Sequence, residues 1–205
     1  GVQTCALPIW SMLEKICKAG EEIGSGIYRK IAELNAEYAL SAEPVPFEER
    51  KNLNYKKIAE GETWSENLWD CAWFRFYGNV PEEYDKNCLC LGIDLDGEGC
   101  LFSEDGTPVR GITNVSSEFD RSLGFPGKRY IPFADGTFRT DKIDLWVEAG
   151  NNDLFGRFCG GKLRQAGIYY CNTELRALFY DFNVLKDLAE NIDERDPLKM
   201  GILYA

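Results

Sequence analysis

The chain has 205 residues, of which 44% are hydrophobic, and its formal net charge at pH 7 is -11. This length and composition are typical of one well-buried domain with additional helices, and they exclude an extended disordered chain. Because no run of lysine or arginine offsets the acidic charge, neither nucleic acid nor an anionic membrane surface is an expected partner.

The residue types that are absent narrow the chemistry further. The chain contains no histidine, which excludes imidazole general-base catalysis, a Ser-His-Asp triad and the commonest zinc chemistry within this chain. No apolar run reaches the roughly 18 residues of a membrane span, and none resembles a secretory signal. The cysteines include no CxxC pair. Without Cys5 their number is odd, which favours a reduced protein, so we expect a cytoplasmic location.

The first nine residues, GVQTCALPI, are similar to the conceptual translation of a sequencing adapter. Residues 1–9 are therefore set apart from the fold as a non-native segment, and Met12 becomes the expected start of the native protein. The alternative is a native, disordered leader. A short helical pattern then begins at Met12.

The next segment has helical spacing. Ile27, Ile31, Leu34 and Tyr38 follow one another at steps of four, three and four residues, which predicts an amphipathic helix over residues 27–40. Two prolines in the following stretch, SAEPVPFEERKN, lack a backbone donor and favour extended geometry. This stretch is therefore predicted to be a linker.

From about Gly61 the pattern changes to short aromatic and β-branched segments separated by turn residues. The candidate strands are CAWFRFYGNV, NCLCLGI, GCLFSE, TPVRGI, KRYIPF and KIDLWVEA. Because no helical pattern lies between them, they predict an antiparallel β-sandwich rather than a parallel sheet.

The helical period returns near the end of the chain. Apolar residues recur at three- and four-residue steps from Leu175 to Ile192, so one whole side of this helix must pack against something. Asp196 is a suitable N-cap for a further helix that begins at Pro197. No termination signal precedes Ala205, and we expect the chain to be truncated there.

An acidic stretch raises the question of a metal site. Asp94, Asp96 and Glu98 alternate before a glycine, and Asp105 takes the twelfth position, as in an EF-hand loop. The flanking residues alternate like strands, however, whereas an EF-hand needs helices. DGEG and EDGT are therefore interpreted as hairpin turns.

Two other patterns are candidate sites. The carboxylates of the acidic stretch, with Glu104 added, are candidates for an acid/base pair in glycoside hydrolysis, but solvated turn residues are the preferred interpretation. Gly156, Gly160 and Gly161 lack the spacing of a phosphate-binding loop and predict bends or bulges.

Exposed aromatic rings can stack on sugar rings. Trp73 and Trp146 lie inside strand-like runs and are expected in the core. Trp64 and Trp69, in the loop-like segment GETWSENLWD, are the candidate carbohydrate contacts, although packing is the preferred interpretation for both.

Several segments, in this order, resemble the N-terminal region of family 38 α-mannosidases, especially the bacterial and cytosolic types. They are GETWSENLWDCAWFRFYGNVPEEY, LCLGIDLDGEGCLFSEDGTPVRGI, PGKRYIPF, DLWVEAGNNDLFG and LRALFYDFNVLKDL. The resemblance runs from about Met12 to the end. It implies a jelly-roll sandwich of the galactose-binding-like type with flanking helices at both ends.

The resemblance also implies a function for the parent enzyme. Family members remove terminal α-linked mannose with retention, and they use zinc, an aspartate nucleophile and a second acidic residue in a catalytic domain. The family's zinc site begins with histidine and aspartate before a tryptophan, so no catalytic or metal residue transfers to this chain. Zinc is expected only in the missing catalytic domain.

We therefore expect an N-terminal accessory domain that is inactive alone. Its expected divisions are a helical extension and linker (10–60), a β-sandwich (61–174) and a helical connection (175–205). The expected partners are the parent's own catalytic domain, α-mannosides bound by the parent, and a second copy in a homo-oligomer. The alternatives are a free-standing carbohydrate-binding module, a purely structural domain, or an accessory domain of another glycosidase.

Overall fold

The computed structural model describes residues 6–113, 128–133, 141–152, 160–193 and 195–204. Its helices are α1 (Ala6–Gly26), α2 (Thr173–Asn191) and α3 (Pro197–Tyr204), and two short 3₁₀ helices are η1 (Phe47–Asn52) and η2 (Lys86–Cys88). The strands are β1 (Tyr28–Glu33), β2 (Asn35–Ser41), β3 (Lys56–Ile58), β4 (Cys71–Asn79), β5 (Leu89–Asp94), β6 (Glu98–Phe102), β7 (Pro108–Thr113), β8 (Tyr130–Pro132), β9 (Lys142–Gly150) and β10 (Gln165–Cys171).

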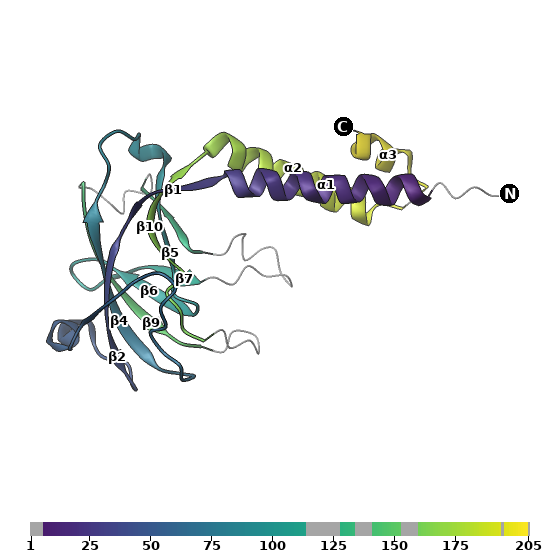
Figure 1. The fold of residues 1–205 in the computed structure, drawn as a ribbon. Helices are drawn as coiled ribbons and strands as arrows, with labels where there is room; N and C mark the ends of the chain where they lie inside the picture. The colour runs from purple at the N-terminus through teal and green to yellow at the C-terminus, as the bar shows by residue number, and fades with distance from the viewer. Residues whose placement is uncertain (1–5, 114–127, 134–140, 153–159, 194, 205) are drawn as a thin grey trace. The chain divides into compact units, whose positions relative to one another are not determined.

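In the described part of the chain these strands form two antiparallel sheets (Figure 1). The four-stranded sheet has the order β1-β10-β5-β8, and the six-stranded sheet has the order β3-β2-β4-β9-β6-β7. The predicted antiparallel sandwich is therefore confirmed. Its strands begin at Tyr28, well before residue 61, where the sequence pattern placed the start of the sandwich.

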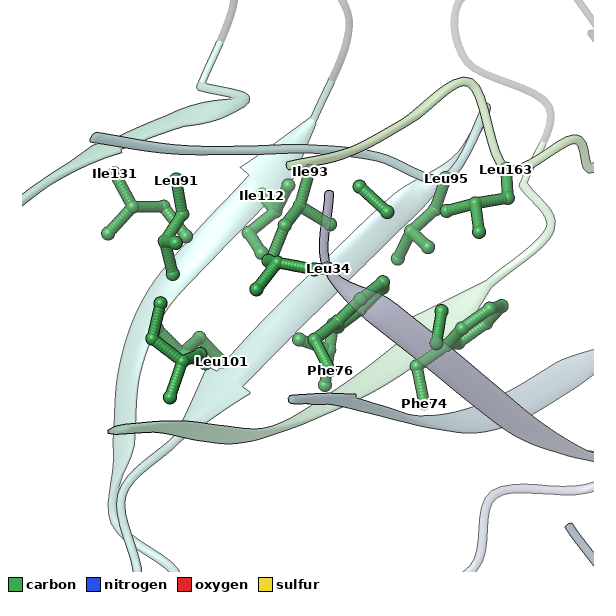
Figure 2. Packing of buried hydrophobic residues seen from close by; sticks show 14 of the residues in the cluster. Leu34, Phe74, Phe76, Leu91, Ile93, Leu95, Leu101, Ile112, Ile131 and Leu163 are labelled. Carbon is green, nitrogen blue, oxygen red and sulfur yellow. The ribbon is translucent and has the colours of Figure 1, made fainter. Parts of the chain in front are cut away.

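The hydrophobic core lies between the two sheets. Figure 2 shows Leu91 and Ile131 of the four-stranded sheet opposite Phe76 and Leu101 of the six-stranded sheet, and all four side chains are buried. In strand β4 the residues that point inward alternate with others that lie on the outer face, as expected for a sheet with one face in the core.

The helix predicted over residues 27–40 is wrong. This segment forms β1 and β2, and β2 pairs with β4 along its whole length, from Asn35 opposite Tyr77 to Ser41 opposite Cys71. Ala36 and Tyr38 point into the core at the two-residue period of a strand. Pairing with residues that lie 30 to 42 positions farther along the chain (Ser41 with Cys71, Asn35 with Tyr77) therefore overrides a local pattern that fits a helix equally well.

The terminal segments form a second compact unit, apart from the sandwich unit Lys30–Tyr170. Within it α1 and α2 run side by side (Figure 1), and an added Cβ at Gly20 or Gly24 would lie only 2.9 Å from the ring of Phe182 or Phe179. The predicted helix at 175–192 is confirmed as α2. The predicted cap of α3 is also confirmed, since Leu198 N–H donates to Asp196 Oδ1 at 2.8 Å.

Among the described helices, none is both long enough and apolar enough to cross a membrane.

Candidate functional site

The loop between β3 and β4 carries both tryptophans that the sequence marked as carbohydrate contacts. In the structure the two side chains have different environments, since Trp64 is buried and Trp69 is exposed. The side chain of Trp64 is 2% exposed, its Nε1 donates to the Leu95 carbonyl at 2.8 Å, and its ring meets that of Phe74 edge-on at 5.5 Å. Packing, the preferred interpretation, therefore holds for Trp64, whose ring faces are not accessible to a sugar.

Trp69 has the opposite environment. It is 62% exposed, and its backbone has a φ of 72°, in the left-handed region that favours glycine. The Trp69 N–H donates to the Asn151 carbonyl at 2.9 Å, which holds this conformation in place. A large aromatic residue at a strained, exposed position is a feature that packing does not explain, so Trp69 remains a candidate contact residue.

Asn151 fixes the loop that presents Trp69. It is 0% exposed, and its Nδ2 donates to Ser65 Oγ and to the Asn67 carbonyl, both at 3.0 Å. Its backbone N–H donates to the Asp70 carbonyl at 2.9 Å. The sequence pattern places Asn151 in an ordinary turn, and its bracing role depends on residues more than 80 positions away, so local sequence gave no signal for it.

The acidic stretch is structural in this fold. The Asp94 and Asp96 residues are 1% and 3% exposed. Asp94 accepts a hydrogen bond from the Asp96 N–H at 3.0 Å and forms an ion pair with Arg129 at 3.2 Å, while Asp96 accepts two bonds from Arg164 at 2.7 and 2.9 Å. Buried carboxylates paired with guanidinium groups stabilise the connection between strands.

The turn predictions for this stretch are right in one case and wrong in the other. EDGT connects the paired strands β6 and β7, and Asp105 accepts hydrogen bonds from Ser103 Oγ at 2.5 Å and from Thr107 N–H at 3.0 Å. The hydrogen bond from Ser103 lowers the pKa of Asp105. DGEG, however, is not a hairpin, because it joins β5 of one sheet to β6 of the other. Strands, not helices, flank the whole stretch, unlike an EF-hand.

Both described glycines near residue 160 have backbones in the left-handed region. Gly160 and Gly161 have φ values of 91° and 51°, and the Gly161 carbonyl accepts the Trp64 N–H at 2.8 Å. Gly156 lies outside the described residues. Bends or bulges were predicted here, and what the structure shows for Gly160 and Gly161 is a pair of positive φ values, which glycine adopts most readily.

Part of the outer face of the six-stranded sheet is covered by residues 44–55, called the arm below. Phe47 of the arm stacks on Phe102 at 5.5 Å, and the Arg50 guanidinium lies 4.7 Å from the ring centre of Trp146. Trp73 Nε1 donates to the Val45 carbonyl at 2.8 Å. Trp73, which was expected in the core, is buried at 2% exposure beneath the arm, whereas Trp146 on the same outer face is only partly buried.

Beside the arm the same face carries an open depression of about 480 Å³. Its lining includes Cys71, Glu98, Cys100, Gly111, Lys128 and Glu148. A smaller hollow of about 250 Å³ shares Gly111 and Lys128 with it. Strand pairing creates this arrangement, because Cys100 lies opposite Glu148 on one side and opposite Gly111 on the other. The depression is within the volume range of small-ligand sites.

Glu148 is the unusual group in this depression. Burial raises the pKa of its carboxyl group. Burial, followed by the negative charge of Glu148, also raises the pKa of the Cys71 and Cys100 thiols, which keeps both protonated. Among the described residues no side chain donates a hydrogen bond to the Glu148 carboxylate or forms an ion pair with it.

The sandwich region also matches a known family. Residues 31–170, more than half of the chain, match the Ams1-like family model described as "Alpha-mannosidase, jelly roll domain". No curated protein matches the chain.

Proposed function

Because the chain belongs to the family of alpha-mannosidase jelly roll domains, we propose that it is the non-catalytic N-terminal accessory domain of an enzyme that removes terminal α-linked mannose. The proposal rests on one observation. The residues that match the family model, 31–170, are almost the same as those of the sandwich unit, Lys30–Tyr170. In this proposal the parent enzyme retains the anomeric configuration and depends on zinc. We also propose a cytoplasmic location, in agreement with the free thiols of Cys17, Cys71, Cys88 and Cys100.

The residues of this chain do not fit a zinc site of the expected kind. The chain has no histidine. The two buried aspartates of the acidic stretch, Asp94 and Asp96, already pair with arginines, which would compete with a metal ion for the same oxygens. In our proposal zinc and both catalytic carboxylates therefore belong to a separate catalytic domain, and no step of hydrolysis is assigned to this chain.

Helix α2 supports a role in packing against that catalytic domain. One side of α2 contacts α1 through residues such as Phe179 and Phe182, and other apolar side chains of α2 remain exposed, among them Leu178, Leu185 and Leu188. An exposed apolar helix face is typical of a docking surface. We propose that the catalytic domain covers it; contacts between copies of the parent are the second use of such a face.

The exposure of the Trp69 side chain favours a second candidate function, that of a free-standing carbohydrate-binding module. Its exposed ring offers a stacking face for the apolar side of a pyranose. Such a module should bind mannosides with measurable heat in calorimetry, and Trp69→Ala should weaken that binding.

The reading frame that encodes the chain distinguishes the two candidates. Sequencing a longer contig should reveal a catalytic domain downstream, beginning with histidine and aspartate before a tryptophan. A stop codon directly after Ala205 would contradict the accessory-domain proposal and favour the free module. If the downstream domain belonged to another glycosidase class, the proposed accessory role of this chain would stand, and the proposed substrate of the parent enzyme would change.

A further inference from the structure

We propose that the depression on the outer face of the six-stranded sheet is a saccharide-binding site in which Glu148 and Lys128 hold the hydroxyl groups of one pyranose ring. This inference rests on the proposed function for the class of sugar, an α-mannoside. The site is separate from Trp69, which is not part of the lining of the depression.

The first argument is the unpaired carboxylate. Glu148 is partly buried and lines the depression, yet no described side chain satisfies its oxygens. Its cross-strand neighbours are Trp73, whose indole N–H donates to the arm, and Cys100, whose thiol contacts the Leu101 carbonyl at 3.8 Å. The Glu148 carboxylate is partly withdrawn from water at the depression, and the hydroxyl groups of a ligand can donate hydrogen bonds to the oxygens that no described side chain contacts.

The second argument is the lysine on the same lining. Lys128 is exposed, and among the described residues none forms an ion pair or hydrogen bond with its ammonium group. Within that part of the chain, the depression therefore presents one acceptor group and one donor group that are not paired with other side chains. Glu98, the other lining carboxylate, already accepts a hydrogen bond from Asn152 Nδ2 at 2.7 Å.

The third argument is the shape and polarity of the floor. A Cβ added at Gly111 would find no atom within 4 Å, so the space above this glycine is open. The thiols of Cys71 and Cys100 stay protonated and present a weakly polar surface. Such a surface suits the C–H face of a sugar ring.

Together these features favour a neutral polyol over other small ligands. A hydroxyl group both donates and accepts, so an uncharged polyol carries groups that suit both the carboxylate of Glu148 and the ammonium group of Lys128, which line the same depression. No three metal-ligating side chains come together among the described residues, which disfavours a metal ion as the ligand. A zwitterion such as an amino acid could also pair with both groups, and it serves as the competing ligand in the test.

The test is a titration of the whole chain with methyl α-D-mannopyranoside, followed by NMR. We expect saturable shifts in the natural chain, and Glu148→Gln should weaken binding by about tenfold or more, as for loss of a hydrogen bond to a charged group. Gly111→Val should abolish binding, because its side chain enters open space and a strand favours valine. Glu83→Gln, an exposed matched control, should leave affinity unchanged.

The outcomes separate this inference from the proposed function. Absence of saturable shifts, or full affinity in folded Glu148→Gln and Gly111→Val, would overturn the site. Tighter binding of glycine at the same signals would overturn the saccharide class. Loss of affinity in Trp69→Ala alone would place the sugar at Trp69 instead. These binding results do not depend on whether a catalytic domain is encoded downstream. That question is tested separately by the reading frame.

Discussion

The guanidinium group of Arg164 donates two hydrogen bonds, at 2.7 and 2.9 Å, to the buried carboxylate of Asp96. This pair ties the connection between the two sheets to the residue that precedes β10. Arg164→Ala should lower the free energy of unfolding by about 2 to 4 kcal/mol, because it leaves a buried charge with fewer partners, while the half-exposed arginine limits the loss.

Urea unfolding of the chain measures this loss. Lys18→Ala is the control, since Lys18 and its partner Glu22 are both exposed and 3.9 Å apart on α1. The control should change stability by no more than about 0.5 kcal/mol. Equal effects of the two substitutions would contradict a structural role for the Asp96–Arg164 pair.

Asn151 and Asn152 are adjacent asparagines with different surroundings. Asn151→Ala should destabilise the chain by about 1 to 3 kcal/mol, because Asn67 and Ser65 lose a buried donor. Asn152→Ala removes only an exposed bond to Glu98 and should cost less than about 0.5 kcal/mol. Thermal unfolding of both variants tests this difference, and a reversed order would refute the bracing role of Asn151.

The strain at Trp69 is tested by comparing two small substitutions. Trp69→Gly and Trp69→Ala both remove the indole, but only glycine adopts a φ of 72° without steric cost. The glycine variant should therefore be more stable than the alanine variant by about 1 kcal/mol in urea unfolding. An alanine variant of equal or greater stability would indicate that the backbone here is not strained.

Glu148 gives a prediction about pH. Because burial raises its pKa in the folded state, the folded chain binds this proton more tightly than the unfolded chain does. The resulting stabilisation is complete below the ordinary pKa of 4.5 and is lost as the pH rises through the raised pKa. Glu148→Gln should therefore be the more stable protein at pH 7, and its advantage should shrink toward pH 4.

Urea midpoints of both proteins, measured from pH 4 to pH 8, test this prediction. The exposed control Glu83→Gln should show no advantage that grows with pH. An advantage of Glu148→Gln that widens as the pH falls would mean that the carboxylate is stabilised, rather than destabilised, by its surroundings.

Strand prediction from the sequence succeeded where aromatic and β-branched segments lie between turn residues. The segments containing β4 and β9 are of this kind, and both are strands. The helix predicted over residues 27–40 is wrong because the apolar spacing of Ile27, Ile31, Leu34 and Tyr38 also occurs in strands, and pairing with β4 decided the structure of residues 35–41. A long-range pairing of this kind leaves no signal in a short window.

The candidate site could be predicted only in part. Trp64 and Trp69 lie in the same short loop, and their different burial depends on Leu95 and Asn151, which are distant in sequence. Glu148 was not singled out, although its alternation with Asp144 and Trp146 in KIDLWVEA placed it on one face of a strand. Because the arm packs on Trp146, this face of the sheet is covered there, whereas at Glu148 it is open.

The most direct test of the accessory-domain proposal is an assay of the purified chain with an aryl α-mannoside, with and without added zinc. A full-length α-mannosidase in the same assay serves as the positive control. We predict no release of the aryl group by this chain under either condition, because it has no histidine and its buried acidic pair is held by arginines. Zinc-dependent turnover that purifies with the chain would contradict the proposal.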